Sequence, residues 1–311
     1  MGRRSKQRRE RISSTISPVL TIFCLVNALS IFLLQAYYTS GNPNVRKDQA
    51  FYAEVSTTSQ QTSSSALSPG EKIDLPILVY HIVRPSYPDD SAAVRALALT
   101  PEAFDAEMLY LHTAGYRIIS FEDLENYFQT GKPLPGKAVI ISFDDGWSDQ
   151  YKYAFPILKK YHYTATFFVF TNPIGRNGFL TWDQLKEMRD AGMTIGNHSR
   201  SHPYLNTITD RYTLWDEVYG SKLVLEKELG IAINQFAYPF GQYNDAVLKM
   251  IAEAGYHSAR GDYYSGVQAA DRIYELSAIN APTTIGLFAK KFPAFSNISE
   301  STKNDAATAW H

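Results

Sequence analysis

Two neighbouring carboxylates, Asp144 and Asp145, stand where an apolar stretch ends, and Gly146 lets the backbone turn directly after them. The stretch before them, residues 138–143, is rich in β-branched residues and reserves no face for water, which is typical of a buried parallel strand. Carboxylates at the end of such a strand cost free energy unless they are solvated, paired or bound to a cation. An Asp-Gly turn alone would account for them, but with the motifs below they become candidates for acid–base or metal chemistry.

Two histidines, His198 and His202, are spaced so that one helical turn would bring both imidazoles within reach of one ion. Such pairs also occur by chance, so their position matters more: they too follow a short apolar strand. In an α/β barrel, residues just beyond the carboxyl ends of the strands converge on one mouth. Two neutral imidazoles and one carboxylate form an open zinc site that leaves a position for water.

A third motif, residues 236–241, also lies at a strand end. Pro239 and Gly241 enforce a turn there, and a turn of this kind can aim a backbone N–H outward. An ordinary turn after a strand is the alternative explanation.

The elements that must position these motifs alternate along the chain. Apolar stretches of strand length alternate with segments of helical periodicity, and this pattern favours an α/β fold with a parallel sheet or an α/β barrel. The expected strands are 76–80, 138–143, 165–170, 194–196, 235–238 and 273–279; the expected helices are 101–114, 121–129, 147–161, 181–191, 212–229 and 244–254.

The composition of the 311 residues, 45% hydrophobic and 14% aromatic, is ample for a sizeable core. The net charge is −1, but the charges are unevenly distributed along the chain. Six basic residues and Glu10 give the first eleven residues a charge of +5, so the remainder carries −6. A nucleic-acid partner is therefore not expected. Cys24 is the single cysteine, so the chain has no intramolecular disulfide and no cysteine metal site.

The N-terminal part of the chain predicts a membrane protein. Residues 1–17 form a basic head, and residues 18–38 are apolar and long enough to cross a bilayer, with the N-terminus in the cytoplasm and the remainder outside. A cleaved signal peptide is the competing interpretation. Residues 39–74, rich in Ser, Thr and Gln, predict a disordered linker; 75–295 form the globular domain, and 296–311 a flexible tail.

The motifs SFDDG, HSRSHPYL and YPFG, in this order, resemble those of the polysaccharide deacetylase family, the NodB-homology domain of carbohydrate esterase family 4. The resemblance covers about residues 75–293 and implies a distorted (β/α) barrel that hydrolyses carbon–nitrogen bonds of acetylated sugars with one divalent metal, zinc. It assigns Asp144 as general base and the backbone N–H of Phe240 to the oxyanion. It assigns Asp145, His198 and His202 as metal ligands. ILVYH at residues 77–81 and FAYPFG are similar to the branch that deacetylates poly-β-1,6-N-acetylglucosamine.

The sequence departs from the family pattern at three places. Ala237 stands where many members have an arginine that pairs with the base, and Ala278 stands where a later arginine could replace it. The late Leu-x-x-His element that supplies a catalytic acid is missing. His81, at the end of the first strand, is therefore the candidate for substrate contact or proton donation, whereas His257 is interpreted as structural.

The predicted function is a membrane-anchored hydrolase that removes N-acetyl groups from an extracellular N-acetylglucosamine polymer, with Trp147 and Tyr238 lining the sugar groove. Peptidoglycan, a chito-oligosaccharide and O-acetylated xylan remain as alternative substrates, and a non-catalytic glycan-binding module as an alternative from another class. The expected partners are the acetylated polysaccharide, the membrane, and machinery for exopolysaccharide synthesis or export.

Overall fold

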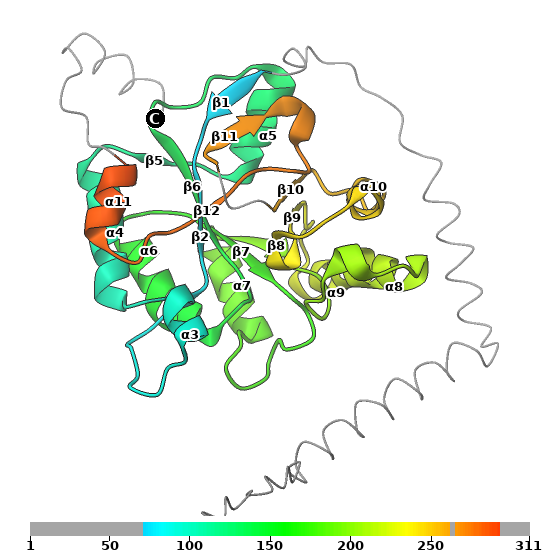
Figure 1. Ribbon diagram of the computed structural model, residues 1–311, viewed down its shortest axis with the longest axis horizontal. Coiled ribbons are helices and arrows are strands. Elements are labelled where there is room, and N and C mark those ends of the chain that lie inside the picture. Colours follow the sequence, from blue (N-terminus) through cyan, green and yellow to red (C-terminus); the bar gives the residue numbers. More distant parts are fainter. Residues whose placement is uncertain (1–70, 262–264, 293–311) are drawn as a thin grey trace, which may run out of the picture. The chain divides into compact units, whose positions relative to one another are not determined.

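The computed structural model describes residues 71–261 and 265–292 (Figure 1). The predicted head, the predicted anchor at 18–38, most of the predicted linker and the tail at 296–311 lie outside these residues. Among the described residues, no helix is long and apolar enough to span a bilayer. The anchor therefore stays a prediction.

The centre of the fold is a curled sheet whose strands all pair in parallel, in the order β10-β9-β8-β7-β6-β2-β12, with β5 beside the start of β6. Leu276 bridges to Arg260 of β10, and Ile279 of β12 pairs with Leu78 of β2, so the two edges are joined through this segment. The predicted α/β class and distorted-barrel type are confirmed. The strands are β2 (Ile77–Tyr80), β5 (Arg117–Ile118), β6 (Ala138–Phe143), β7 (Thr166–Val169), β8 (Thr194–Asn197), β9 (Gln235–Ala237), β10 (Ser258–Arg260) and β12 (Ile279–Asn280).

Helices cover the outer side of the sheet, where Figure 1 shows α4, α6, α7 and α9 following one another. Two of them begin at the capping signals that the sequence carries: Ser120 with Asp123 caps α5, and Thr181 with Gln184 caps α7. The helices are α3 (Ala92–Leu97), α4 (Pro101–Thr113), α5 (Phe121–Thr130), α6 (Phe155–Lys160), α7 (Trp182–Asp190), α8 (Arg211–Trp215), α9 (Ser221–Leu229), α10 (Asp245–Glu253) and α11 (Ile285–Lys291).

The alternation of side chains along the strands determines which residues meet inside the barrel. On β6, Ile141 and Phe143 belong to the larger core, while Ile140 belongs to the smaller core inside the barrel. The other buried members of this inner core include Ile77, Val79, Phe168, Ala237, Leu276 and Ala278. By the same two-residue period, Asp144 follows Ile140 on the inner face, and His81 follows Val79. The strands thus direct these two polar side chains to one place.

The structure differs from the expected elements at several points. Strand β1 (Lys72–Asp74) pairs antiparallel with β11 (Val267–Ala269) and lies inside the predicted linker, so the folded domain begins before Leu75. The reason is Ile73, which packs against the inner core. The predicted helix at 147–161 begins as a π-helix, η1 (Gln150–Ala154). Strands β3 (Ile82–Val83) and β4 (Ala98–Leu99), the π-helix η3 (Asp216–Gly220) and the 3₁₀ turns η2 (Leu205–Thr207), η4 (Pro239–Gly241) and η5 (Ala270–Arg272) complete the described elements.

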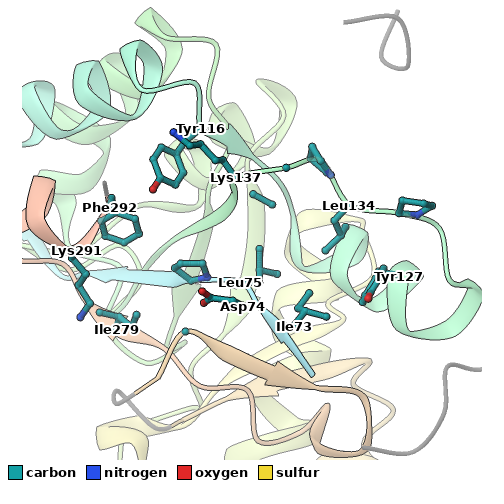
Figure 2. A pocket seen from close by; sticks show the side chains of 16 residues that line it. Ile73, Asp74, Leu75, Tyr116, Tyr127, Leu134, Lys137, Ile279, Lys291 and Phe292 are labelled. Atoms are coloured by element: carbon teal, nitrogen blue, oxygen red, sulfur yellow. The ribbon is translucent and has the colours of Figure 1, made fainter. Parts of the chain in front are cut away.

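A pocket of about 940 Å³ lies at the amino ends of the strands (Figure 2). Its walls include Leu75, Ala138 and Ile279, which precede or begin β2, β6 and β12. The candidate catalytic residues follow the carboxyl ends of the strands and do not line this pocket.

Candidate active site

Three side chains at the carboxyl ends of β6 and β8 form a cluster with metal-binding geometry. One ligand atom from each of Asp145, His198 and His202 lies within 4.8 Å of the other two. The Nε2 atoms of His198 and His202 are 3.1 Å apart. Asp145 Oδ1 lies 3.7 Å from His198 Nε2 and 3.3 Å from His202 Nε2. Tetrahedral ligands at about 2.1 Å from a zinc ion lie about 3.4 Å from one another. The donor set therefore fits one tetrahedral metal with an open position.

His198 is prepared as a neutral ligand. Its side chain is 2% exposed, and Nδ1 lies 2.7 Å from the Ala237 carbonyl, so Nδ1–H donates there and leaves the Nε2 lone pair facing the cluster. Burial is the main cause that lowers the pKa of His198 to about 4, against the opposing charge of Asp144. The imidazole is accordingly uncharged at neutral pH, as a metal ligand must be.

A hydrogen bond to Oδ2 orients the carboxylate of Asp145. Trp147 Nε1–H donates to Oδ2 at 3.0 Å, which turns Oδ1 toward the histidines. Burial raises the pKa of the Asp145 carboxyl, but the hydrogen bond from His202 and the charges of His198 and His81 outweigh it, so the pKa lies below its ordinary range. The carboxylate is ionised and available to a cation.

The backbone of the site is strained. Of the six non-glycine residues with positive φ among those described, four lie here: Asp145 (φ 73°), Ser199 (φ 73°), His202 (φ 61°) and Phe240 (φ 59°). Each such conformation costs roughly 1–3 kcal/mol and persists only where the surroundings hold it. Gly146, with φ 70°, follows Asp145, and a Cβ there would lie 2.9 Å from Val169 Cγ1. This turn accounts for the glycine of the SFDDG motif.

Asp144 is fully buried beside Arg260. The guanidinium NH2 of Arg260 donates to Asp144 Oδ1, and the two side chains are 0% and 1% exposed. Oδ2 of Asp144 has no hydrogen-bond partner among the described residues. This buried carboxylate therefore has one oxygen paired with the guanidinium and one oxygen left to accept a proton.

Arg260 was not predicted, and its position explains how the chain manages without an arginine at 237. Arg260 of β10 is the register partner of Ala237 on β9, and Leu276 bridges it on the other side. The small Ala237 side chain leaves space inside the barrel, which the guanidinium reaches from the next strand. The two positions at which the family pattern places an arginine, 237 and 278, are alanines buried in the inner core.

His81 lies at the same mouth. Its Nε2 is 4.0 Å from Asp144 Oδ2, longer than a hydrogen bond. Gln150 Nε2 donates to the carbonyls of His81 (2.8 Å) and Asp144 (2.6 Å) and so ties the ends of β2 and β6 together. The imidazole thus lies near Asp144 and is 15% exposed.

Phe240 lies in a tight turn. Gly241 N–H donates to Tyr238 O and Gln242 N–H to Pro239 O, and neither bond uses the N–H of Phe240. The Phe240 ring packs against His202 (centroids 4.6 Å) and stacks on Tyr204 (4.0 Å, 14°). Tyr204 is 51% exposed and Phe240 44%, so an aromatic surface adjoins the metal cluster.

The two residues predicted to line a sugar groove have different surroundings. Trp147 is half-buried, stacked on Phe179 with centroids 4.7 Å apart. Tyr238 is fully buried in the larger core, and its hydroxyl donates to the Tyr274 carbonyl at 2.9 Å. The position of Tyr238 contradicts the predicted contact with sugar, because Ala237 faces the barrel interior and the next side chain must face the helices. His257, interpreted as structural, directly precedes β10, at the end opposite Arg260, and its Nδ1 lies 3.6 Å from Glu125 Oε2.

Known proteins are similar to this chain in sequence and fold. The sequence profile described as polysaccharide deacetylase matches residues 131–259. The Bacillus subtilis (strain 168) protein YxkH, which carries the same description, is 30% identical over 241 residues that span 76% of this chain and 83% of YxkH. The chain belongs to the polysaccharide deacetylase family. It is accordingly an enzyme, as predicted.

Three further proteins are similar to this polysaccharide deacetylase. The poly-β-1,6-N-acetyl-D-glucosamine N-deacetylase of Staphylococcus epidermidis is 28% identical over 211 residues, 60% of this chain and 71% of that enzyme. The solved structure of the Streptococcus pyogenes deacetylase PplD in complex with acetate matches with a TM-score of 0.64 and 29% identity, over 70% of this chain and 94% of PplD. IcaB from Ammonifex degensii shares the fold, with a TM-score of 0.60 and 24% identity over 72% of this chain and 96% of IcaB.

Proposed function

We propose that this deacetylase removes N-acetyl groups from an extracellular N-acetylglucosamine polymer of the poly-β-1,6-linked type, with one zinc ion at Asp145, His198 and His202. The observation that carries the proposal is the convergence of these three ligand atoms beside the buried Asp144, whose Oδ2 is free. Amide hydrolysis needs an activated water, a stabilised oxyanion and a proton for the leaving amine. The site offers a group for each.

A bound zinc ion would lower the pKa of a water ligand to about 7 and polarise the acetyl carbonyl. Asp144 Oδ2 accepts the proton of the attacking water, while Arg260 holds the opposite oxygen. The backbone N–H of Phe240 donates to the oxyanion that forms at the acetyl carbonyl. His81 or the protonated Asp144 then gives a proton to the leaving amine.

The aromatic residues around the cluster support a glycan as substrate. The His202 ring contacts Phe240 of the exposed Tyr204–Phe240 pair (4.6 Å between centroids) and also Phe170 (5.2 Å). Phe170 in turn contacts Phe179 (5.6 Å). Rings with one exposed face supply rigid apolar contact area at little entropic cost. The resemblance to the staphylococcal enzyme supports the poly-β-1,6 linkage.

The location of the enzyme is also part of the proposal. The sequence of residues 1–38 supports a cytoplasmic N-terminus, one transmembrane helix and a catalytic domain outside the membrane. There the enzyme would meet the polymer, together with machinery for its synthesis or export.

The test is acetate release by the zinc-loaded enzyme from poly-β-1,6-N-acetylglucosamine, chitin oligomers, peptidoglycan and acetylated xylan in parallel. We expect release from the poly-β-1,6 polymer. Release from one of the other three instead would move the assignment to that substrate. Binding to a glycan without release of acetate from any of them would favour the non-catalytic module.

A further inference from the structure

A π-helical turn contacts the loop that carries both metal-binding histidines. This turn, η3 (Asp216–Gly220), follows α8 directly and leads into α9. Single π-turns within α-helices are rare and recur at functional sites. The contacts of η3 with this loop could therefore affect the geometry of the metal centre. The inference rests on the metal site proposed above.

The carboxylate of Glu217 binds the two residues that precede His202. Its Oε2 accepts the backbone N–H of Arg200 at 3.0 Å and of Ser201 at 2.9 Å, and its Oε1 accepts the Ser201 hydroxyl. Glu217 is only 7% exposed, so these donors replace water around its charge. A single carboxylate thus fixes the backbone immediately before the second histidine.

The same turn also binds the residue that precedes His198. Asn197 Nδ2 donates to the Val218 carbonyl at 3.2 Å and lies 2.7 Å from Ser221 Oγ at the start of α9. Asn197 is completely buried. Both histidines are therefore preceded by residues that are hydrogen-bonded to the turn and to the helix it begins.

A third contact between the loop and η3 is an ion pair of Arg200 with Asp216. Arg200 Nε lies 2.8 Å from Asp216 Oδ2, and its NH2 lies 2.8 Å from Oδ1, a bidentate pair. Gly220 makes room for this pair, since a Cβ there would lie 2.5 Å from Asp216 Oδ1 and 2.8 Å from the guanidinium. The space for the ion pair is built into the turn.

We propose that Glu217 is a positioning residue for the metal centre. Ser199 and His202 both have positive φ, and His202 N–H donates to Ser199 Oγ at 3.0 Å, so the loop adopts a conformation that it would leave without external support. Glu217 supplies that support through three hydrogen bonds to Arg200 and Ser201. It keeps the His202 imidazole where its Nε2 and that of His198 face one ion.

The test is the zinc affinity of the full-length protein, measured by competition with a chromophoric chelator. We expect Glu217→Ala to weaken zinc binding 10- to 100-fold, the range typical when a group that orients a ligand is lost. Glu217→Gln should lose much less, because the amide oxygen still accepts the two N–H groups and the amide NH₂ can donate to the Ser201 hydroxyl. With Co²⁺ in place of zinc, the visible spectrum of Glu217→Ala should differ from that of the wild type.

Glu125→Ala is the matched control. Glu125 is equally buried, at 4% exposure, and accepts hydrogen bonds from Ser258 (2.6 Å) and Gln235 (3.1 Å), away from the metal cluster. It should lower the unfolding temperature without changing zinc affinity. A general loss of stability would affect both alanine variants alike.

A folded Glu217→Ala protein that binds zinc with wild-type affinity would overturn the inference. If this variant does not fold, Ser201→Ala is tested in its place, because it removes the hydroxyl that donates to Glu217. Weakened zinc binding by Ser201→Ala would support the inference, and unchanged zinc binding would overturn it. The titration involves no glycan. Normal zinc binding by a wild type that releases no acetate would therefore refute the proposed function and leave the role of Glu217 standing.

Discussion

Replacement of Arg260 by methionine removes the partner of Asp144 while keeping much of the side-chain volume. The side chains of Arg260 and Asp144 are at most 1% exposed, so no water can replace the lost contact unless the structure rearranges. Unit charges about 4 Å apart attract by about 4 kcal/mol at an effective dielectric constant of 20. Removing one partner of a buried pair costs about 3–5 kcal/mol. The guanidinium also lies 4.7 Å from the centre of the Phe168 ring, and its loss adds a smaller cost.

We therefore expect Arg260→Met to lower the free energy of unfolding by about 3–5 kcal/mol. Urea unfolding of the metal-free protein measures this directly, and with a slope of about 2–3 kcal/mol per molar the midpoint should fall by more than about 1 M. The double variant Asp144→Asn/Arg260→Met removes both charges, so it should recover about 2–3 kcal/mol relative to Arg260→Met.

The double variant decides between an ion pair and mere packing. If Arg260 acted only through its volume, Asp144→Asn would give no recovery in the absence of the arginine. A loss below about 1 kcal/mol for Arg260→Met, or a double variant less stable than Arg260→Met, would refute the reasoning.

Three further predictions follow from contacts around the site. Burial raises the pKa of Glu107 to about 8, above its ordinary 4.5, despite the hydrogen bond from Tyr80. Between these two pH values the folded protein keeps a proton on Glu107 that the unfolded chain loses. The free energy of unfolding should therefore fall as pH rises from about 4.5 to 8, by up to about 1.4 kcal/mol per pH unit. Urea unfolding at pH 5 and pH 8 should show this loss for the wild type and not for Glu107→Gln; equal losses would contradict it. Trp147→Phe keeps the stacking on Phe179 but removes the hydrogen bond to Asp145, so zinc affinity should fall about tenfold in a chelator titration, and an unchanged affinity would exclude an orienting role. Tyr204→Ala should raise KM for the polymer severalfold and leave the hydrolysis of a small acetyl ester unchanged in steady-state assays; equal effects on both substrates would argue against sugar contact.

Much of the fold and site could be predicted because the motifs follow strands with clear hydrophobic patterns. Residues 138–143 were expected as a strand, and β6 has these bounds. The carboxyl ends of parallel strands meet at one edge, so a carboxylate was expected near His198 and His202, and the family resemblance assigned that place to Asp145; the structure brings the three together.

Arg260 could not be predicted because it depends on tertiary register. Strand β10 has three residues, too few for a periodic pattern, and the significance of Arg260 appears only when it lies beside Ala237. Tyr238 was misjudged for a related reason: the motif places it near the site in sequence, but the alternation of the strand turns it into the core. That alternation was available in the sequence and would have corrected the assignment.

The most direct test of the account is the initial rate of acetate release from poly-β-1,6-N-acetylglucosamine as zinc is added back to the metal-free enzyme. The rate should rise in proportion to bound zinc and level off at one equivalent. Asp144→Asn should bind the same equivalent and release acetate about 10²- to 10⁴-fold more slowly, the contribution expected of a general base. A rate independent of zinc, or a zinc-loaded Asp144→Asn enzyme as fast as the wild type, would contradict the account.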